Sequence, residues 1–355
     1  MLVISCPGAL VISTPVSIVS GIGNGAKKGI LFKGGETIEN LSKGDLVLID
    51  KTGTLTHGKM ALKEVKVFND YNENEIIKLI AIAQKYSEHP ISNAILNYAK
   101  SLDIDYSEEL EDIELIIGSG IKYRYNKNNY YVGNLKITPK NLINNNLRNK
   151  INEMENIGLT VIGLYDELKV IALLGISDSI RESSKSLVKK LKKKGIKKII
   201  MLTGDNENIA RIVSKELNLD KYYANLKPVD KLEIIEKYQQ KGFKPIFIGD
   251  GINDAPALSK SKIGIALKDL GKDIAAEAAD IVIVSENILK VNEALTLSKA
   301  VKTNMFQNIM IALIVVIILI LGVIFQVINM AIGMLVHEIS VIVVILNAIR
   351  LLSFK

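Results

Sequence analysis

A short apolar segment that ends in a polar turn constrains this chain more than any other stretch. Residues 46–49 read LVLI, and residues 50–56 follow at once as DKTGTLT. The uninterrupted apolar run predicts a buried β-strand. A carboxylate at its end, that of Asp50, would be held in place while its oxygens stay accessible, which suits a nucleophile that attacks phosphorus. Lys51 and the threonine hydroxyls and amides of the turn would bind phosphate oxygens.

Two later strand-like segments end in polar residues of the same kind. One reads IIML and leads into Thr203, Gly204 and Asp205, and the other reads IFIG and leads into Asp250. In a doubly wound sheet the carboxyl ends of the strands converge on one crevice, where ligands bind. We therefore expect these residues to meet Asp50 at one edge of a sheet.

If these strand ends converge, their carboxylates predict a magnesium site. Mg²⁺ binds one or two carboxylates together with phosphate oxygens and water, so Asp50 and Asp250 are the expected protein ligands. Asp254 would supply a further acid, and Lys231, in the segment KPVDK, would supply positive charge. The pattern thus predicts a site for a hard cation and a phosphate group.

The region from residue 36 to about residue 300 alternates strand-like and helix-like segments, which predicts βαβ units and a mainly parallel sheet. Strands are expected at 46–49, 171–176, 198–202, 245–248, 263–266 and 281–284, and helices at 181–195, 207–217 and 229–241. Residues 59–164 differ in amino-acid composition, because they are rich in tyrosine and asparagine. They are expected to form a domain inserted after the first strand.

Apolar residues concentrate at the two ends of the chain. Residues 1–22, 305–328 and 330–349 are long and apolar enough to predict three membrane spans. Lysines follow the first span and precede the second, and basic residues follow the third, which places the region between the spans in the cytoplasm. We expect an integral membrane protein, in the plasma membrane, with cytoplasmic catalytic domains.

The net charge of +7 fits those basic flanks better than a nucleic-acid partner. The lysines are spread over helices and loops, aromatic residues make up 5% of the chain, and no nucleic-acid motif occurs. A lysine-rich stretch at residues 189–198 alternates with leucine and valine, which predicts the solvated face of an amphipathic helix. A single cysteine, Cys6, excludes an internal disulfide.

The ordered set DKTGT, TGD, KPxxK and GDGINDAP, within residues 45–285, resembles the haloacid dehalogenase-like core of P-type ATPases. The resemblance implies that Asp50 is phosphorylated, that Asp250 and the carbonyl of Thr52 bind Mg²⁺, and that ATP is the phosphate donor. It places Thr203, Lys231 and Asn253 on the phosphoryl group. The expected catalytic set is Asp50, Lys51, Thr52, Thr203, Gly204, Asp205, Lys231, Asn253 and Asp254.

The inserted region contains SEHP at 87–90, GSG at 118–120 and GN at 133–134. In this order the three motifs resemble the nucleotide-binding domain of the heavy-metal-transporting branch of P-type ATPases. There the histidine orients ATP, and the glycines let the backbone approach it. The resemblance implies ATP contacts from Glu88, His89, Gly118, Gly120 and Asn134.

The first span contains CPG at residues 6–8, which resembles the metal-ligating CPx motif of heavy-metal pumps, although a second cysteine is usual where Gly8 stands. Ionisable residues at membrane depth are costly and mark functional sites, so His337 and Glu338 are further candidates. One thiolate, an imidazole and a carboxylate favour a divalent ion such as Zn²⁺, Cd²⁺ or Co²⁺ over monovalent copper. Two plainer readings stand beside this: Cys6 as a small packing residue, and the His-Glu pair at the outer interface.

The second span carries Asn304, Gln307 and Asn308 on one helix face. They would line an ion path or hydrogen-bond to one another near the cytoplasmic interface.

The predicted fold class is α/β: a haloacid dehalogenase-like Rossmannoid phosphorylation domain with an inserted α+β nucleotide-binding domain, flanked by transmembrane helices. The expected parts are 1–35 (span with CPx-like motif and cytoplasmic exit), 36–58 and 165–300 (phosphorylation domain), 59–164 (nucleotide-binding domain) and 301–355 (two spans).

The sequence contains no TGE motif, which in the resembled pumps lies in an actuator domain that precedes the CPx span. We therefore expect the C-terminal, catalytic half of a pump, truncated or split, which acts only with a separately encoded N-terminal half. Two alternatives remain at this point: an ATP-binding membrane module with a regulatory role, and a soluble-type phosphatase of the same superfamily. Such phosphatases carry a second aspartate where this chain has Thr52, which would serve as general acid and base.

Overall fold

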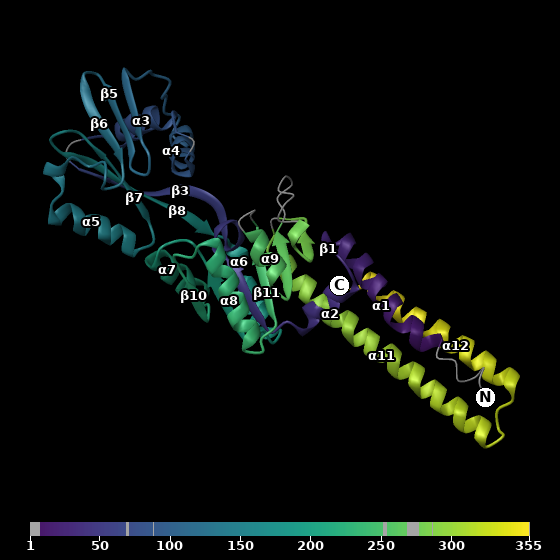
Figure 1. Cartoon of the computed structure of the whole chain (residues 1–355). Helices are drawn as coiled ribbons and strands as arrows, with labels where there is room; N and C mark the ends of the chain where they lie inside the picture. The colour runs from purple at the N-terminus through teal and green to yellow at the C-terminus, as the bar shows by residue number, and fades with distance from the viewer. Residues whose placement is uncertain are drawn as a thin grey trace.

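The computed structural model describes residues 8–68, 71–87, 89–250, 254–267, 277–285 and 287–354. Figure 1 shows three bodies in a row: a sheet with flanking helices at one end, an α/β body in the middle, and a bundle of long helices at the other end. The N-terminal end of α1 points toward the far end of the bundle, and the C-terminal end of α12 points back toward the middle body.

The middle body is built on a seven-stranded sheet in the order β1-β13-β12-β11-β2-β9-β10. Its strand pairs are parallel, except that β1 runs antiparallel to β13. The strands are β1 (Ile30–Phe32), β2 (Leu46–Asp50), β9 (Lys198–Leu202), β10 (Lys221–Tyr223), β11 (Pro245–Gly249), β12 (Ile263–Leu267) and β13 (Ile281–Ile283).

Helices cover both faces of this sheet, which explains why its central strands are apolar throughout. One face packs against α2 (Gly35–Lys43), α6 (Glu182–Lys193), α7 (Glu207–Leu217) and the first turns of α11 (Lys290–Ile324). The other face packs against α8 (Pro228–Gln240) and α9 (Ala255–Lys260). The carboxyl ends of the parallel strands therefore open at one edge of a three-layer body, as the sequence predicted.

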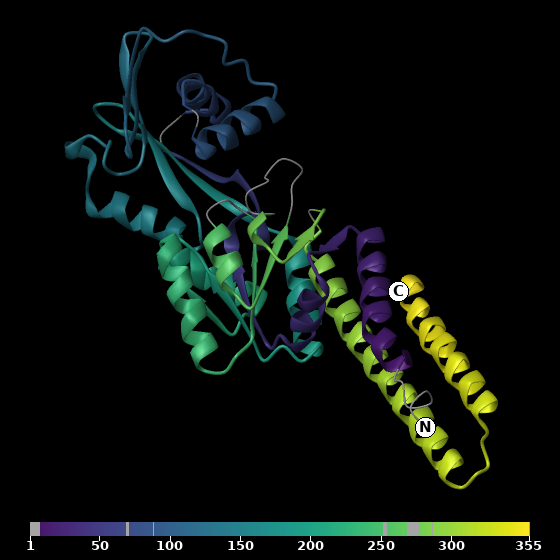
Figure 2. The same cartoon turned by 45° about the vertical axis from the view of Figure 1, so that its right-hand side comes forward.

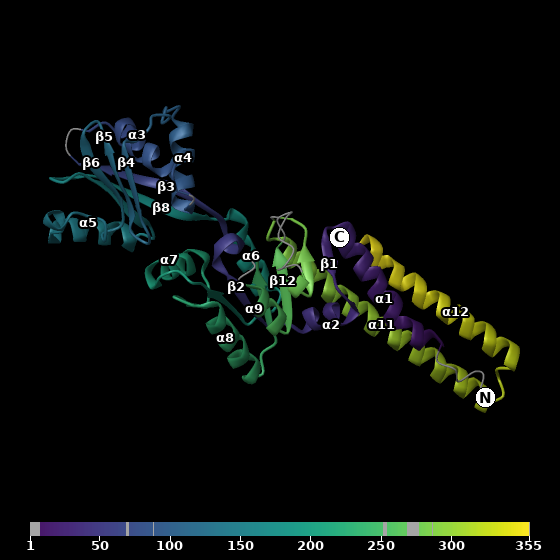
Figure 3. The same cartoon turned by 45° about the horizontal axis from the view of Figure 1, so that its top comes forward.

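The second sheet has six strands, all antiparallel, in the order β3-β8-β7-β6-β5-β4. Figure 3 shows α5 on one side of it and α3 and α4 on the other. The elements are β3 (Thr56–Val67), α3 (Glu73–Gln84), α4 (Pro90–Ser101), β4 (Asp112–Ile116), β5 (Gly120–Tyr125), β6 (Asn128–Gly133), α5 (Asn145–Asn156), β7 (Thr160–Tyr165) and β8 (Val170–Ile180). Short 3₁₀ turns lie at Lys140–Leu142 and Arg350–Ser353.

The strand predicted at 171–176 exists, but its place in the parallel sheet was wrong. It forms part of β8, which pairs antiparallel with β3 and β7. The predicted domain boundary between residues 164 and 165 would therefore assign β8 to the middle body, whereas β8 belongs to the second sheet. Long strands β3 and β8 lead from the middle body into the second sheet side by side, so the two bodies are joined by a paired ribbon.

Among the described residues, three helices are long and apolar enough to cross a membrane: Gly8–Lys27, Lys290–Ile324 and Met330–Ser353. These are α1, α11 and α12 (Met330–Ile349) with its 3₁₀ extension, and Figure 2 shows them alongside one another. The span predicted at 305–328 needs correction, because α11 ends at Ile324 and residues 325–328 lie beyond it.

Candidate active site

Asp50 ends the fully buried strand β2 and is itself 7% exposed. Its neighbours in the sheet, β9 and β11, are followed directly by Thr203 and Asp250 respectively, so the three strand ends meet as predicted. The tight turn Lys51–Leu55 begins directly after Asp50. Within it Gly53 has φ +74°, and a Cβ at that position would lie 1.9 Å from Oδ2 of Asp250. Only glycine therefore lets the turn pass this close to the second carboxylate.

Lys231 is the positive centre of the site. Its Nζ donates to Oδ1 of Asp50 at 2.6 Å and to Oδ1 of Asp254 at 2.7 Å. All three side chains are largely buried. Burial alone would lower the pKa of Lys231, but the attraction of Asp50 and Asp254 outweighs it and raises that pKa. Lys231 is therefore a permanent cation in this site.

Three carboxylates gather around that single cation. One oxygen each from Asp50, Asp250 and Asp254 lies within 4.8 Å of the others. Burial, then the charge of Asp254, and in smaller measure that of Asp250, raise the pKa of Asp50 to about 7 against the opposing pull of Lys231. Two buried carboxylates and one half-buried carboxylate offer the oxygen ligands that a hard divalent cation prefers, so the residues present fit the predicted Mg²⁺.

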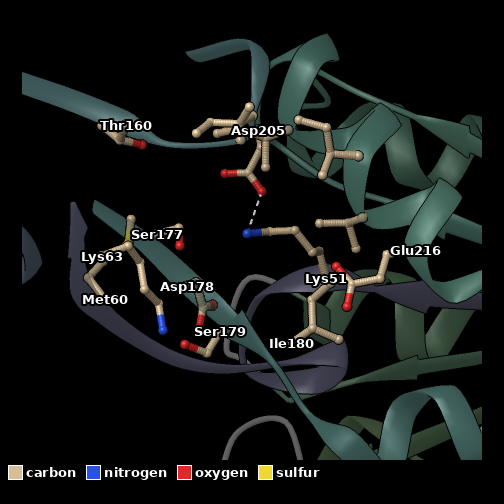
Figure 4. A pocket seen from close by; sticks show the side chains of 15 residues that line it. Lys51, Met60, Lys63, Thr160, Ser177, Asp178, Ser179, Ile180, Asp205 and Glu216 are labelled. Atoms are coloured by element: carbon tan, nitrogen blue, oxygen red, sulfur yellow. Dashed lines mark ion pairs between the residues drawn. The ribbon is translucent and has the colours of Figure 1, made fainter. Parts of the chain in front are cut away.

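Lys51 and Asp205 face each other beside Asp50. Their charged atoms lie 2.8 Å apart, and Oγ1 of Thr203 donates to the same Asp205 oxygen at 2.7 Å. Figure 4 shows Lys51 reaching toward Asp205 across a cavity of about 290 Å³. Residues from β3, β7, β8 and α7 also line this cavity, so it lies where the two sheet bodies approach each other. Gly204 follows Thr203, and a Cβ built on Gly204 would lie 3.3 Å from the carbonyl oxygen of Leu226.

Sequence reasoning missed a set of hydrogen bonds that holds the turn Lys51–Leu55 in place. Arg181, just after β8, donates through Nε to the carbonyl of Thr56 and through Nη2 to that of Gly53. Ser184 donates to the carbonyl of Leu55, and Asp178 accepts from the Thr56 hydroxyl. These bonds tie the turn after Asp50 to the ribbon that leads to the second sheet. A polar cluster, DSIR, at the end of a long apolar strand was the available signal.

The predicted nucleotide residues line a second, larger cavity of about 650 Å³ in the antiparallel-sheet body. His89, Gly118, Gly120 and Asn134 all lie on its wall, although they come from three separate parts of the chain. Its remaining wall is mostly apolar, which suits a nucleobase. Gln84 and Ser92, hydrogen-bonded to each other at 2.5 Å, are buried polar members of this wall that the sequence did not single out.

Backbone geometry explains the glycines of this cavity. Gly120 and Gly133 face each other on β5 and β6, and a Cβ on Gly120 would lie 2.1 Å from the Val132 carbonyl oxygen. Asn134 closes the turn by donating to the carbonyl of Gly118 at 3.0 Å. His89 caps α4, because its Nδ1 accepts from the amide of Ile91 at 3.2 Å. Its Nε2 is consequently the nitrogen left for a ligand.

The candidate ion ligands are only partly brought together. A Cβ built on Gly8 would lie 3.1 Å from Nε2 of His337, so the imidazole reaches the start of α1, two residues after Cys6 in the sequence. Glu338 lies on the exposed side of α12. Cys6 lies outside the described residues, as do two other predicted site residues, Glu88 and Asn253. Thr52 is exposed within the turn.

The asparagines of α11 satisfy one another. Asn308 donates to Ser17 of α1 and accepts from Asn347 of α12, and Asn304 accepts from Ser17 and donates to the carbonyl of Asn347. Gln307 is exposed on the other side of the helix. Of the two predicted readings, the structure favours mutual hydrogen bonding, which joins the three helices at one level.

A strand-end aspartate, a bridging lysine and two further carboxylates thus lie together at the carboxyl edge of a parallel sheet. Residues 45–261 match the family model "haloacid dehalogenase-like hydrolase". The whole chain is 38% identical to a probable cadmium-transporting ATPase of Alkalihalophilus pseudofirmus and to a cadmium-transporting ATPase of Staphylococcus aureus, of which it covers 50% each. A crystal structure of a zinc-transporting PIB-type ATPase in the E2.Pi state superposes with a TM-score of 0.91 at 32% identity, over 99% of this chain and 57% of that one.

The chain therefore belongs to the haloacid dehalogenase-like hydrolases and, within them, to the heavy-metal P-type ATPases. It spans about half the length of the curated relatives that it matches. The predicted fold class is confirmed by the same comparisons.

Proposed function

We propose that this chain is the catalytic half of an ATP-driven heavy-metal pump that works through an aspartyl phosphate. The observation that carries the proposal is the gathering of Asp50, Asp250 and Asp254 at the carboxyl edge of the parallel sheet, with Lys231 of α8 bridging Asp50 and Asp254. A nucleotide-sized cavity in the second sheet body supports ATP as the phosphate donor. The ribbon β3–β8 joins that cavity to the nucleophile.

Asp50 is the proposed nucleophile, and Lys231 orients it. Because Lys231 binds Oδ1, the other oxygen, Oδ2, is the one that we propose attacks the γ-phosphorus. The new bond joins Oδ2 to phosphorus, and the bond from phosphorus to the bridging oxygen of ADP breaks. Lys51 and Thr203 lie beside Asp50 and both contact Asp205. When the substrate is bound, the two side chains would also donate to oxygens of the transferred phosphoryl group.

Asp50 and Asp250, with the backbone carbonyl of Thr52, are the proposed Mg²⁺ ligands. The ion would offset charge on the phosphoryl group and favour the ionised form of Asp50, whose pKa is otherwise about 7. Asp254 stays with Lys231 and holds it in place. No residue two positions after Asp50 can act as general acid, since Thr52 stands there, and this favours a long-lived phosphoenzyme over a phosphatase cycle.

The proposed cargo is a divalent ion such as Zn²⁺, Cd²⁺ or Co²⁺. His337 beside Gly8 supports a ligand set that combines this imidazole with the thiolate of Cys6, with Glu338 nearby in sequence. The relatives named above carry cadmium or zinc in their descriptions. We place the protein in the plasma membrane, with its two sheet bodies in the cytoplasm. We propose that these bodies work together with an actuator-bearing N-terminal half.

Replacing Gly120 with alanine should weaken ATP binding about tenfold or more. The new Cβ would meet the Val132 carbonyl, and relieving that contact costs backbone strain of about 1–3 kcal/mol at the cavity wall. Displacement of a fluorescent ATP analogue measures the loss. Gly242→Ala is the matched control, because Gly242 also has positive φ but its Cβ would meet nothing within 4 Å. Equal binding by both variants would contradict the assigned cavity.

The purified chain alone should form an acid-stable phosphoprotein from ATP slowly and should not turn over. Combined with an actuator-bearing N-terminal half, it should hydrolyse ATP with stimulation by Zn²⁺, Cd²⁺ or Co²⁺ and not by monovalent copper. Steady-state phosphate release with each metal measures this. Rapid metal-stimulated hydrolysis by the chain alone would overturn the proposed division of labour.

A further inference from the structure

The lysine-rich end of α6 occupies a position that the catalytic cycle does not explain. Seven of the ten residues from 189 to 198 are lysines, and no aspartate or glutamate occurs between Glu182 and Asp205. The apolar residues of this helix, Leu187, Val188 and Leu191, are buried against the sheet, which confirms the predicted amphipathic pattern. The lysines consequently face outward together.

A contact with α11 places this cluster close to the membrane. Nζ of Lys299, on α11, donates to the backbone carbonyl of Lys194, just past the end of α6. Lys299 lies six positions before Met305, where the apolar part of α11 begins. At 1.5 Å per residue this is about 9 Å along the helix axis.

The headgroup layer ends roughly 1–4 Å short of that level. The hydrocarbon core is about 30 Å thick and the bilayer with its headgroups about 40–45 Å, so each headgroup layer adds roughly 5–8 Å. A lysine side chain can extend its charged end over that remaining distance. Exposed Lys193 and half-buried Lys194, with exposed Lys302 on α11 nearer still, are therefore within reach of lipid phosphates.

Few of these charges are neutralised within the protein. Lys192 pairs with Asp220 at 3.1 Å and Lys197 with Asp45 at 2.9 Å. Lys189, Lys190 and Lys193 are exposed and have no carboxylate partner within the described ranges of the chain. Unpaired lysines within reach of the headgroups are attracted by anionic lipid within about a Debye length.

We propose that the end of α6, residues 189–194, together with Lys302 of α11, is a docking surface for anionic lipid headgroups of the cytoplasmic leaflet. The surface fixes the tilt of the α/β body relative to the bilayer. It requires that the three helices span a membrane and does not require that the protein transports an ion, so it can fail or hold independently of the pump assignment.

The test uses the full chain in nanodiscs of phosphatidylcholine or of an equal mixture with phosphatidylglycerol. Amine-reactive labelling followed by mass spectrometry reports the accessibility of each lysine. In anionic discs, labelling of Lys189, Lys190, Lys193 and Lys194 should slow roughly fivefold. It should return in high salt, where the Debye length falls to about 3 Å. Inorganic phosphate added to phosphatidylcholine discs should give no such protection.

Matched variants separate the surface from general charge. Lys189→Gln/Lys190→Gln/Lys193→Gln should abolish the lipid-dependent protection of Lys194. Lys100→Gln/Lys127→Gln/Lys140→Gln removes the same charge from exposed lysines of the antiparallel-sheet body and should leave that protection intact. Equal labelling in both kinds of disc would overturn the proposal. An equal slowing of Lys100, Lys127 and Lys140 in the unchanged chain would overturn it as well.

Discussion

Asp50→Asn is expected to reduce phosphoprotein formation from ATP to background. The amide keeps the shape of the side chain and can accept from Lys231, but its nitrogen and neutral oxygen do not attack phosphorus as a carboxylate does. Labelling from γ-labelled ATP, followed by acid precipitation and gel electrophoresis, measures the product. Sensitivity of the label to hydroxylamine identifies it as an acyl phosphate.

Asp45→Asn is the matched control for this change. Asp45 stands immediately before the other end of β2, where it pairs with Lys197 and accepts from the amide of Lys244, far from the phosphorylation turn. It should label like the unchanged chain. Hydroxylamine-sensitive label that persists in Asp50→Asn would remove Asp50 from the role of acceptor.

Lys231→Met should destabilise the strand ends of the site by about 3–5 kcal/mol, because it leaves two buried carboxylates without their shared partner. Hydrogen exchange of the amides of β2 and β11 measures the loss of protection. Phosphoprotein formation should fall with it, since Oδ1 of Asp50 is no longer held.

Lys237→Met serves as the control on the same helix. Lys237 is exposed on α8, and exposed substitutions of this kind change stability by about 0.5 kcal/mol or less. In addition, Lys231→Met/Asp254→Asn should recover part of the lost protection, because it removes one of the two orphaned charges. If Lys231→Met leaves the exchange of β2 unchanged, the lysine does not hold the site together.

The strand-end site could be predicted because its information is local. Each contributing strand is a short apolar run that ends in a polar signature, and parallel strands present such ends at one edge. The nucleotide cavity could be predicted from the sequence for a different reason. Its motifs, at His89, Gly118 and Asn134, are individually weak, and their order along the chain supplied the resemblance that grouped them.

The remaining features depend on contacts that one sequence does not display. The run at 171–176 reads equally well as a strand of either sheet, because periodicity reports burial and not the pairing partner. Arg181 and Ser184 contact carbonyls more than 120 residues away in sequence, and a carbonyl has no residue identity to read. The end of α11 was placed too late, since apolar composition continues to Ile328 after the helix has stopped.

Helix α11 connects the α/β body to the bilayer as one uninterrupted rod. Its first turns are buried in the core of the sheet body, its later turns pack against α1 and α12, and residues 290–321 contain neither glycine nor proline. Thirty-five residues make a rod of about 52 Å, which bends only at a cost without such residues. A tilt of about 5° at its base would therefore displace the far end by roughly 4–5 Å, so the sheet and the membrane segment move as the two arms of one lever.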